Sequence, residues 1–324
     1  MDLKKLNKIP KNYFKEVMAS LSKLEKLKKV HFFSGIHFTD AEKELAKKIE
    51  NYKKVEREAK KVWKIVELSR DENRPQCLDY IEGIFKDFVQ LSGDRITGED
   101  KSIISGIGKI EGTTAAVIGN NKGKDTKQRV QYNFGMSIPQ GYRKSQRIMR
   151  LADRFGFPII TFIDTPGAYP GLEAEDDGQA GAIAKSILLM FEAKVPIIAV
   201  LIGEGGSGGA LALAIGNYVM MLKNSTYSVI SPEGCAAILW KDPSGSKLAA
   251  RALKLTSKDL LRLKIIDKII HEPMGGAQNN PKRMVKIVKK YIQEALGKYK
   301  GIPGEELKMQ RARKYESMGI FKSS

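Results

Sequence analysis

The sequence contains few residues for metal or nucleophile chemistry. Its 324 residues include only two cysteines, Cys77 and Cys235, and three histidines. Two cysteines cannot form a disulfide framework, and with so few histidines they do not complete a four-ligand zinc site. The scarcity of histidine also argues against a Ser–His or Cys–His nucleophile pair. Free cysteines are typical of a cytosol-like compartment.

Long apolar runs are also missing. The first thirty residues lack the apolar stretch of a secretory signal and are too rich in lysine and too poor in serine for a transit peptide. The longest apolar run, 195–221, is interrupted by Glu204 and Asn217, so neither half reaches the roughly 20 residues of a spanning helix. With 42% hydrophobic residues and only 12 prolines, we expect a globular protein without a membrane segment.

Positive charge is abundant and lies mainly at the two ends. The formal net charge is +19, and residues 1–70 hold 19 basic against 10 acidic residues. Residues 281–324 hold 12 against 4, while the middle of the chain is nearly balanced. Such ends either meet an acidic partner or polyanion, or form a solvated lysine-rich surface.

Hydrophobic periodicity separates helical ends from an α/β middle. Apolar spacings of three and four over residues 12–68, broken near 31–39, predict two amphipathic helices, and two basic ones are expected over 281–297 and 304–318. Between them, continuous apolar runs typical of strands buried on both faces alternate with helical patterns, which fits layered β-β-α units. Strands are expected at 103–110, 113–119, 158–164, 196–203, 218–222 and 227–231, and helices at 177–192 and 207–215.

We therefore expect three parts. Residues 1–70 form a basic helical arm that serves assembly, 71–300 form the α/β domain, and 301–324 form a C-terminal helical tail.

Residues 164–167, with the sequence DTPG, match the DxxG switch of GTPases. A nucleotide-binding protein of that class also needs GxxxxGK[ST] for the phosphates and magnesium. The Gly-Lys pairs at 108, 123 and 297 are followed by Ile, Asp and Tyr, so no P-loop is present. We reject a P-loop NTPase.

A glycine-rich turn, GEGGSGGALA over residues 203–212, follows a predicted buried strand and opens a predicted helix. The first N–H groups of a helix have no partner within it, and the helix dipole favours negative charge there. Gly208 and Gly209 would let an oxygen approach these N–H groups closely. The alternative is that the glycines allow close helix–strand packing. Two glycine pairs within five residues favour an oxyanion site.

Charged residues flank this turn in two places. The carboxylates Glu173, Glu175, Asp176 and Asp177 are candidates for general bases or metal ligands, but negative charge before a helix beginning near Asp177 is the favoured interpretation. The basic side chains of Lys124, Lys127, Arg143 and Lys144 are candidates for the phosphates of a large cofactor. A solvated helix face explains the two at 143 and 144 about as well.

Four ordered motifs resemble the carboxyltransferase alpha subunit of the multi-subunit acetyl-CoA carboxylase, and the likeness runs from about residue 72 to about 318. The motifs are IDTPGAYPG (163–171), GEGGSGGALA (203–212), STYSVISPEG (225–234) and EPMGGA (272–277). The resemblance implies a crotonase-like (ClpP/crotonase) spiral of β-β-α units. It also implies transfer of a carboxyl group from carboxybiotin on a carrier protein to acetyl-CoA, giving malonyl-CoA for fatty acid synthesis.

The same resemblance assigns roles to residues of the turn. The backbone N–H groups of Gly208 and Gly209 would hold the ureido oxygen of biotin as negative charge gathers on it. The biotin-binding set implied is Gly205, Gly206 and Ser207 with Gly167, Ala168 and Tyr169. No metal or covalently bound cofactor is expected on this chain. The freed ureido nitrogen would take the acetyl α-proton, so no side-chain base is needed.

The resemblance further implies partners and a compartment. These are a zinc-containing carboxyltransferase beta subunit in an α₂β₂ heterotetramer, biotin carboxyl carrier protein and biotin carboxylase, in a bacterial cytoplasm or a plastid stroma. One departure is QAGA over 179–182, where Gly181 replaces the family's acidic residue. Two alternatives stay open: the carboxyltransferase half of a biotin-dependent acyl-CoA decarboxylase, and a basic nucleic-acid-binding protein. No RNP-like strand, KH loop or zinc finger supports the second.

Overall fold

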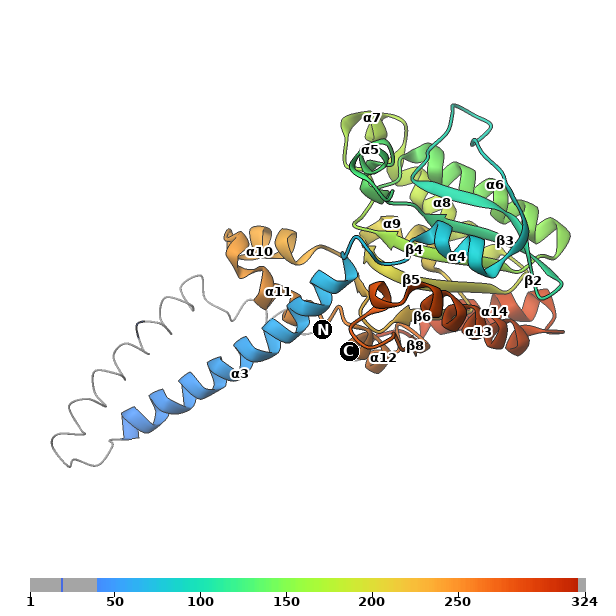
Figure 1. Cartoon of the computed structure of the whole chain (residues 1–324). Helices are drawn as coiled ribbons and strands as arrows, with labels where there is room; N and C mark the ends of the chain where they lie inside the picture. Colours follow the sequence, from blue (N-terminus) through green and yellow to red (C-terminus); the bar gives the residue numbers. More distant parts are fainter. Residues whose placement is uncertain (1–18, 20–39, 320–324) are drawn as a thin grey trace, which may run out of the picture. The chain divides into compact units, whose positions relative to one another are not determined.

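The computed structural model describes residue 19 and residues 40–319 (Figure 1). The expected helix break near residues 31–39 lies outside the described residues, whereas Asp40–Ser69 forms one continuous helix, α3. Within the described ranges, no helix is both long enough and apolar enough to cross a membrane.

The chain divides into two compact units. One comprises residues up to Lys64 together with Pro232–Leu253, and the other comprises Ile65–Ser231 and Lys254 onward. The first unit holds most of α3 with α10 (Pro232–Trp240), η2 (Pro243–Gly245) and α11 (Ser246–Leu253). Within it, Arg251 of α11 forms an ion pair of 2.7 Å with Glu58 of α3. The assembly role of the arm stays a prediction.

The second unit is built on one mixed sheet in the order β1-β2-β3-β4-β5-β6-β8, with β7 paired to β5. The first three strands are antiparallel to one another, and the others pair in parallel. The strands are β1 (Lys86–Gln90), β2 (Ile103–Ile110), β3 (Thr113–Asn120), β4 (Ile159–Thr165), β5 (Ile197–Gly206), β6 (Tyr218–Leu222), β7 (Thr226–Ser228) and β8 (Lys268–Ile270). The predicted strands are thus confirmed, with ends that differ by a few residues.

The hairpin between β2 and β3 shows why the sequence folds this way locally. Ile110 pairs with Thr113, so Glu111 and Gly112 form a two-residue loop. Both have positive φ, 45° and 77°. That geometry matches the twist of the flanking strands, and glycine adopts it without strain.

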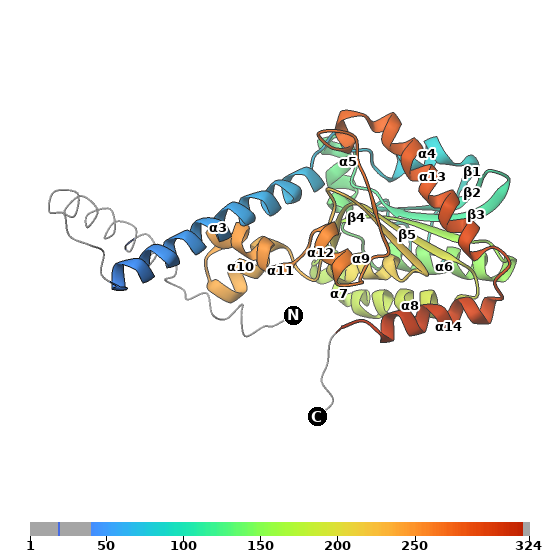
Figure 2. The same ribbon diagram turned by 90° about the horizontal axis from the view of Figure 1, so that it is seen from below.

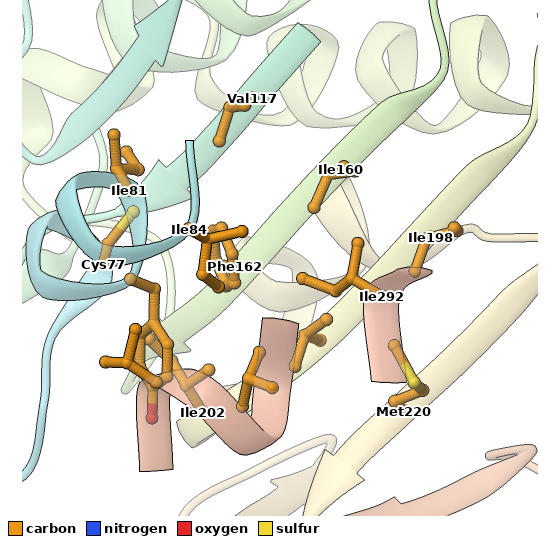
Figure 3. Packing of buried hydrophobic residues seen from close by; sticks show 14 of the residues in the cluster. Cys77, Ile81, Ile84, Val117, Ile160, Phe162, Ile198, Ile202, Met220 and Ile292 are labelled. Carbon is orange, nitrogen blue, oxygen red and sulfur yellow. The ribbon is translucent and has the colours of Figure 1, made fainter. Parts of the chain in front are cut away.

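Helices cover both faces of the sheet, which explains the continuous apolar strands. The helices of this unit are α4 (Cys77–Ile84), α5 (Thr126–Gln131), η1 (Asn133–Gly135), α6 (Pro139–Phe155), α7 (Leu172–Asp176), α8 (Gln179–Glu192), α9 (Ser207–Ala214), α12 (Ser257–Arg262), η3 (Ala277–Asn279), α13 (Pro281–Tyr299) and α14 (Gly304–Glu316). On β4, Phe162 faces the cluster under α4 and α13, while Ile163 faces the cluster under α6, α8 and α9. Figure 3 shows Phe162 beside Cys77 and Ile84 of α4, and Ile292 of α13 near Ile198 and Met220.

The C-terminal helix α14 lies beside α8 (Figure 2) and is tied to the sheet by one fully buried side chain, Arg311. Its guanidinium donates to the carbonyl of Ala193 and to Oδ1 of Asn217. Asn217 in turn accepts from the N–H of Ile197 at 3.1 Å and donates to the carbonyl of Leu307 at 2.8 Å. One polar network therefore joins the beginning of β5 to α14.

Replacing Arg311 should therefore destabilise the second unit. Arg311→Leu removes the guanidinium donor from the buried carbonyl of Ala193, at a cost of about 1–3 kcal/mol, and one of the two donors to Asn217 Oδ1. Urea unfolding should show the loss. Arg313→Leu on the exposed side of the same helix is the control and should change the free energy of unfolding by less than about 0.5 kcal/mol. Equal midpoints for the two variants would contradict this role of Arg311.

Candidate functional site

Two loops meet where the parallel strands β4 and β5 end. Thr165, the last residue of β4, pairs with Gly205 near the end of β5. A Cβ on Gly206 would collide with the carbonyl oxygen of Pro166, and one on Gly209 would lie 2.6 Å from the amide nitrogen of Ala168. The structure thus brings together the two predicted groups, Gly205–Ser207 and Gly167–Tyr169, although they are far apart in the sequence.

The glycines of the turn serve different purposes. A side chain at Gly203 would overlap the carboxylate of Asp164, and Gly206 and Gly209 face backbone atoms of the 166–168 segment. These three positions need glycine for close packing, the alternative considered from the sequence. Gly208 differs, because its Cβ would meet only the side chain of Ile183, at an ordinary 3.5 Å. Packing therefore does not explain the glycine at 208.

The N-terminus of α9 is suited to binding an anion. Gly206 occupies the N-cap and has no side chain with which to cap the helix. The N–H groups of Ser207, Gly208 and Gly209 come before the first i→i−4 bond of the helix, and the helix dipole adds positive potential there. Ser207 is exposed and has a φ of 50°, which turns the chain sharply from strand into helix.

The opposing loop, 166–171, is held by polar contacts. Thr165 Oγ1 donates to the carbonyl of Gly167 at 2.7 Å and accepts from its N–H at 3.1 Å. Gln179 Nε2, at the start of α8, donates to the carbonyls of Ser137 and Tyr169, both at 2.9 Å. Sequence reasoning did not give Gln179 a role; its position in the QAGA segment was the only signal.

The helix predicted near Asp177 begins at Gln179, so the acidic run does precede it, but most of the run is itself helical. Three of its carboxylates belong to a short helix of their own, α7, while α8 begins at Gln179 after Gly178 in the left-handed conformation (φ 82°). Asp177 instead pairs with Arg143 at 2.9 Å. Glu173 of α7 hydrogen-bonds the Tyr169 hydroxyl and raises its pKa.

Arg143 and Lys144 carry structural contacts that leave no donor for a phosphate. Arg143 donates to Asp94 at 2.8 Å, to Thr97 at 2.7 Å and to Asp177. The Lys144 ammonium is buried and donates to Glu99 and to two backbone carbonyls at 2.7 Å. The structure thus corrects the phosphate-binding expectation for both residues. Lys124 pairs with Asp79 at 2.5 Å at the surface, and Lys127 is exposed on α5.

A charged cluster that the sequence did not reveal joins the ends of three strands. Lys122, just after β3, contacts Asp164 at 2.7 Å and Glu204 at 2.9 Å. Arg70 binds the other oxygen of Glu204 at 2.7 Å. Burial opposes ionisation of both Lys122 and Glu204, but the opposite charges prevail, raising the pKa of Lys122 and lowering that of Glu204. No spacing in the sequence links these residues.

Comparison with known proteins gives a consistent family. A model described as acetyl co-enzyme A carboxylase carboxyltransferase-like matches residues 11–319. The chain is 47% identical to the acetyl-coenzyme A carboxylase carboxyl transferase subunit alpha of Thermus thermophilus over 86% of this chain and 88% of that protein. For the Gluconacetobacter diazotrophicus protein of the same name, the identity is 49% over 84% and 86%.

Solved structures of similar fold are more distant in sequence. A transcarboxylase 12S structure has a TM-score of 0.58 and 16% identity over 82% of this chain, which spans only 46% of the transcarboxylase chain. A Pseudomonas malonate decarboxylase hetero-tetramer structure has a TM-score of 0.60 and 15% identity, with 75% of this chain and 96% of that chain covered. They confirm the expected crotonase-like fold.

Asp94, which anchors Arg143, generates a pH-dependent prediction. Burial favours its protonated form, but N–H bonds from Gly98, Ile96 and Thr97 together with Arg143 outweigh burial and lower the pKa of Asp94. A depressed native pKa contributes stability above the unfolded-state pKa of about 3.9, and that contribution is lost as pH falls further.

Asp94→Asn should therefore lower the free energy of unfolding at pH 7 by about 2–3 kcal/mol. The difference from the parent protein should narrow below about pH 4, where Asp94 itself takes up a proton on unfolding. Urea titrations across pH 3–7 measure the difference. If the difference in free energy of unfolding between the two proteins stayed constant over this range, the ionised carboxylate of Asp94 would not be the source of the stability.

Proposed function

The chain belongs to the family of acetyl-CoA carboxylase carboxyltransferase alpha subunits, and from this we propose that the N-terminus of α9 is its carboxybiotin-binding and transfer site. A biotin-dependent carboxyltransferase moves the carboxyl group to acetyl-CoA and yields malonyl-CoA. One observation carries the assignment of the site: Gly208 is a glycine of the turn that packing does not require, and it lies among the N–H groups that α9 leaves unpaired.

Gly208 and Gly209 would act through their backbones. As the carboxyl group leaves the ureido nitrogen, negative charge gathers on the ureido oxygen, and the two N–H groups would stabilise it there. One such donor is worth about 2.7–4 kcal/mol when it faces developing charge. Proton transfer from the acetyl α-carbon to the freed ureido nitrogen needs no side-chain base.

The two loops would form the walls of the biotin site. Gly205, Gly206 and Ser207 bring the strand into the turn, and Gly167 to Tyr169 lie opposite, held by Gln179. The close backbone contact between the loops supports this assignment, because it leaves the N–H groups of α9 next to the 166–169 segment. A flat ureido ring has the size of ligand that such a narrow site admits.

As an alpha subunit, the chain implies a beta partner. We assign the zinc and most of the acetyl-CoA site to that partner, in an α₂β₂ assembly served by biotin carboxyl carrier protein and biotin carboxylase. Lys124 and Lys127, both exposed on or beside α5, stay candidates for CoA phosphates. A bacterial cytoplasm or a plastid stroma as the compartment stays a prediction. Relatives at 47–49% identity favour the acetyl-CoA reaction over decarboxylation.

The purified chain should be inactive alone and form malonyl-CoA only with a beta subunit, because we assign most of the acetyl-CoA site to that partner. Mixing the chain with the beta subunit of a relative, carboxybiotin on a carrier protein and acetyl-CoA, and following malonyl-CoA formation, measures this. Free biotin with malonyl-CoA measures the same transfer in reverse. Substantial carboxyl transfer by the chain alone would contradict the assignment of most of the acetyl-CoA site to the beta subunit.

Gly208→Ala is the sharpest test of the backbone donors. The added methyl group has room in the structure, so folding and binding of the beta subunit should persist, whereas the ureido oxygen would be pushed away from the N–H groups. Turnover should fall roughly 10²–10³-fold, the effect of losing one oxyanion donor. Gly181→Ala, where a Cβ meets nothing within 4 Å, is the control and should leave turnover unchanged.

Gly209→Val is not suited to this test. A side chain there would displace the backbone at Gly167 and Ala168, so lost activity would not separate folding from catalysis. Near-normal turnover in Gly208→Ala with an intact complex would rule out the backbone-donor mechanism.

A further inference from the structure

The Lys122 cluster joins the ends of β3, β4 and β5. Asp164 lies one residue before the end of β4, and Glu204 lies two residues before the end of β5. Both carboxylates contact the same ammonium, and the three side chains are only 12–18% exposed. A charge so shielded from water interacts more strongly with its partners than a surface ion pair does.

Asp164 connects the cluster directly to the glycine-rich turn. Its Oδ1 accepts the backbone N–H of Glu204 at 2.9 Å, and its carboxylate fills the space beside Gly203. Its own N–H donates to Asn120 Oδ1 at 3.2 Å, at the end of β3. Movement of the Asp164 carboxylate would therefore move the backbone that leads into Ser207.

Both loops of the site begin at these carboxylates. Two residues after Asp164 comes Pro166, whose carbonyl touches Gly206, and two residues after Glu204 comes Gly206 itself. If the two carboxylates moved apart, the loops would separate at the place where the carbonyl and the glycine meet. The distance between the α9 N–H groups and the opposite wall thus depends on the Lys122 contacts.

We propose that Lys122 is a positioning residue of the carboxyl-transfer site, holding the 164–169 and 203–209 segments together by neutralising Asp164 and Glu204 at once. The expected change in kcat rests on the proposed function, whereas the claim that Lys122 holds the two segments together does not. Lys122 does not contact the reacting atoms in this role. Its raised pKa keeps the amine protonated at neutral pH, so it does not act as a general base there.

Removal of the ammonium should produce a recognisable electrostatic defect. In Lys122→Met the two carboxylates face each other without a cation between them, and like charges at close range disfavour double ionisation. Arg70 still faces Glu204, and Arg74, Cys77 and Tyr80 lie around Asp164, but none of them bridges the pair. Uptake of one proton at lower pH would replace the repulsion with a carboxyl–carboxylate hydrogen bond.

The test measures carboxyl transfer by the complex with the beta subunit. Lys122→Met should lower kcat roughly 10²-fold at pH 8, the usual scale for a displacement of about 1 Å in a site, with little change in KM for acetyl-CoA. Lys122→Arg keeps the charge and should retain most of the activity. In Lys122→Met, kcat should recover severalfold between pH 8 and pH 6 relative to the parent enzyme.

A second substitution and a matched control distinguish a kcat loss caused by repulsion between Asp164 and Glu204 from one caused by general destabilisation of the fold. Adding Glu204→Gln to Lys122→Met removes the repulsion and should restore kcat at least tenfold. Lys314→Met is the control: this side chain is 17% exposed, against 18% for Lys122, and pairs with Asp267 beside the start of β6. It should lose stability to a similar degree while keeping kcat.

Amide hydrogen exchange gives a readout that does not need activity. In Lys122→Met, the amides of 166–169 and 205–210 should exchange faster, while those of α14 should not. Unchanged exchange in both segments, or a kcat within twofold of the parent enzyme, overturns the proposal. A kcat loss that neither acid pH nor Glu204→Gln relieves also overturns it, since Lys122 would then act on the substrate. If the parent complex transfers no carboxyl group, the proposed function fails, and the exchange result still decides the role of Lys122.

Discussion

The close approach of two backbone segments, at Pro166 and Gly206, is the constraint on which the site depends. No side chain fits between them, so the carbonyl of one loop lies against the turn of the other. This contact places the unpaired N–H groups of α9 beside the 166–169 segment. Gly209 extends this backbone contact to Gly167 and Ala168, while Gly203 leaves room for the carboxylate of Asp164.

A parallel sheet with both faces covered makes that approach reproducible. β4 and β5 pair in register from Ile159 with Ile197 to Ile163 with Leu201, and after a register shift Thr165 pairs with Gly205, so the two strands end at the same end of the sheet. Two apolar clusters, one on each face, fix the strands, and the buried Arg311 network ties the opposite edge to α14. Backbone donors can replace catalytic side chains only where the backbone itself is rigid, and this architecture supplies that rigidity.

Charge in this protein is divided between surface and interior roles. The positive net charge comes mainly from the chain ends, whereas the buried cations Arg74, Lys144 and Arg311 each bind acceptors inside the fold. Basic residues that resembled phosphate ligands in the sequence therefore include structural ones. Residue type and sequence spacing alone cannot distinguish a phosphate-binding basic residue from a structural one. Both roles require the same positive group, and they differ only in which atoms lie within hydrogen-bond distance of it.

The sequence by itself determined six of the eight strands of the sheet, the helix after the glycine-rich turn and the two loops of the candidate site, since apolar runs and glycine pairs are local signals. The short edge strands β1 and β8 were not predicted. It also identified the family through four ordered motifs. Only the tertiary structure decided that Gly203, Gly206 and Gly209 serve packing while Gly208 does not, that Arg143 and Lys144 are already engaged, and that Lys122 joins Asp164 to Glu204. These facts depend on contacts between residues far apart in the sequence, such as Glu204 with Asp164, which are 40 positions apart, and no local pattern encodes such contacts.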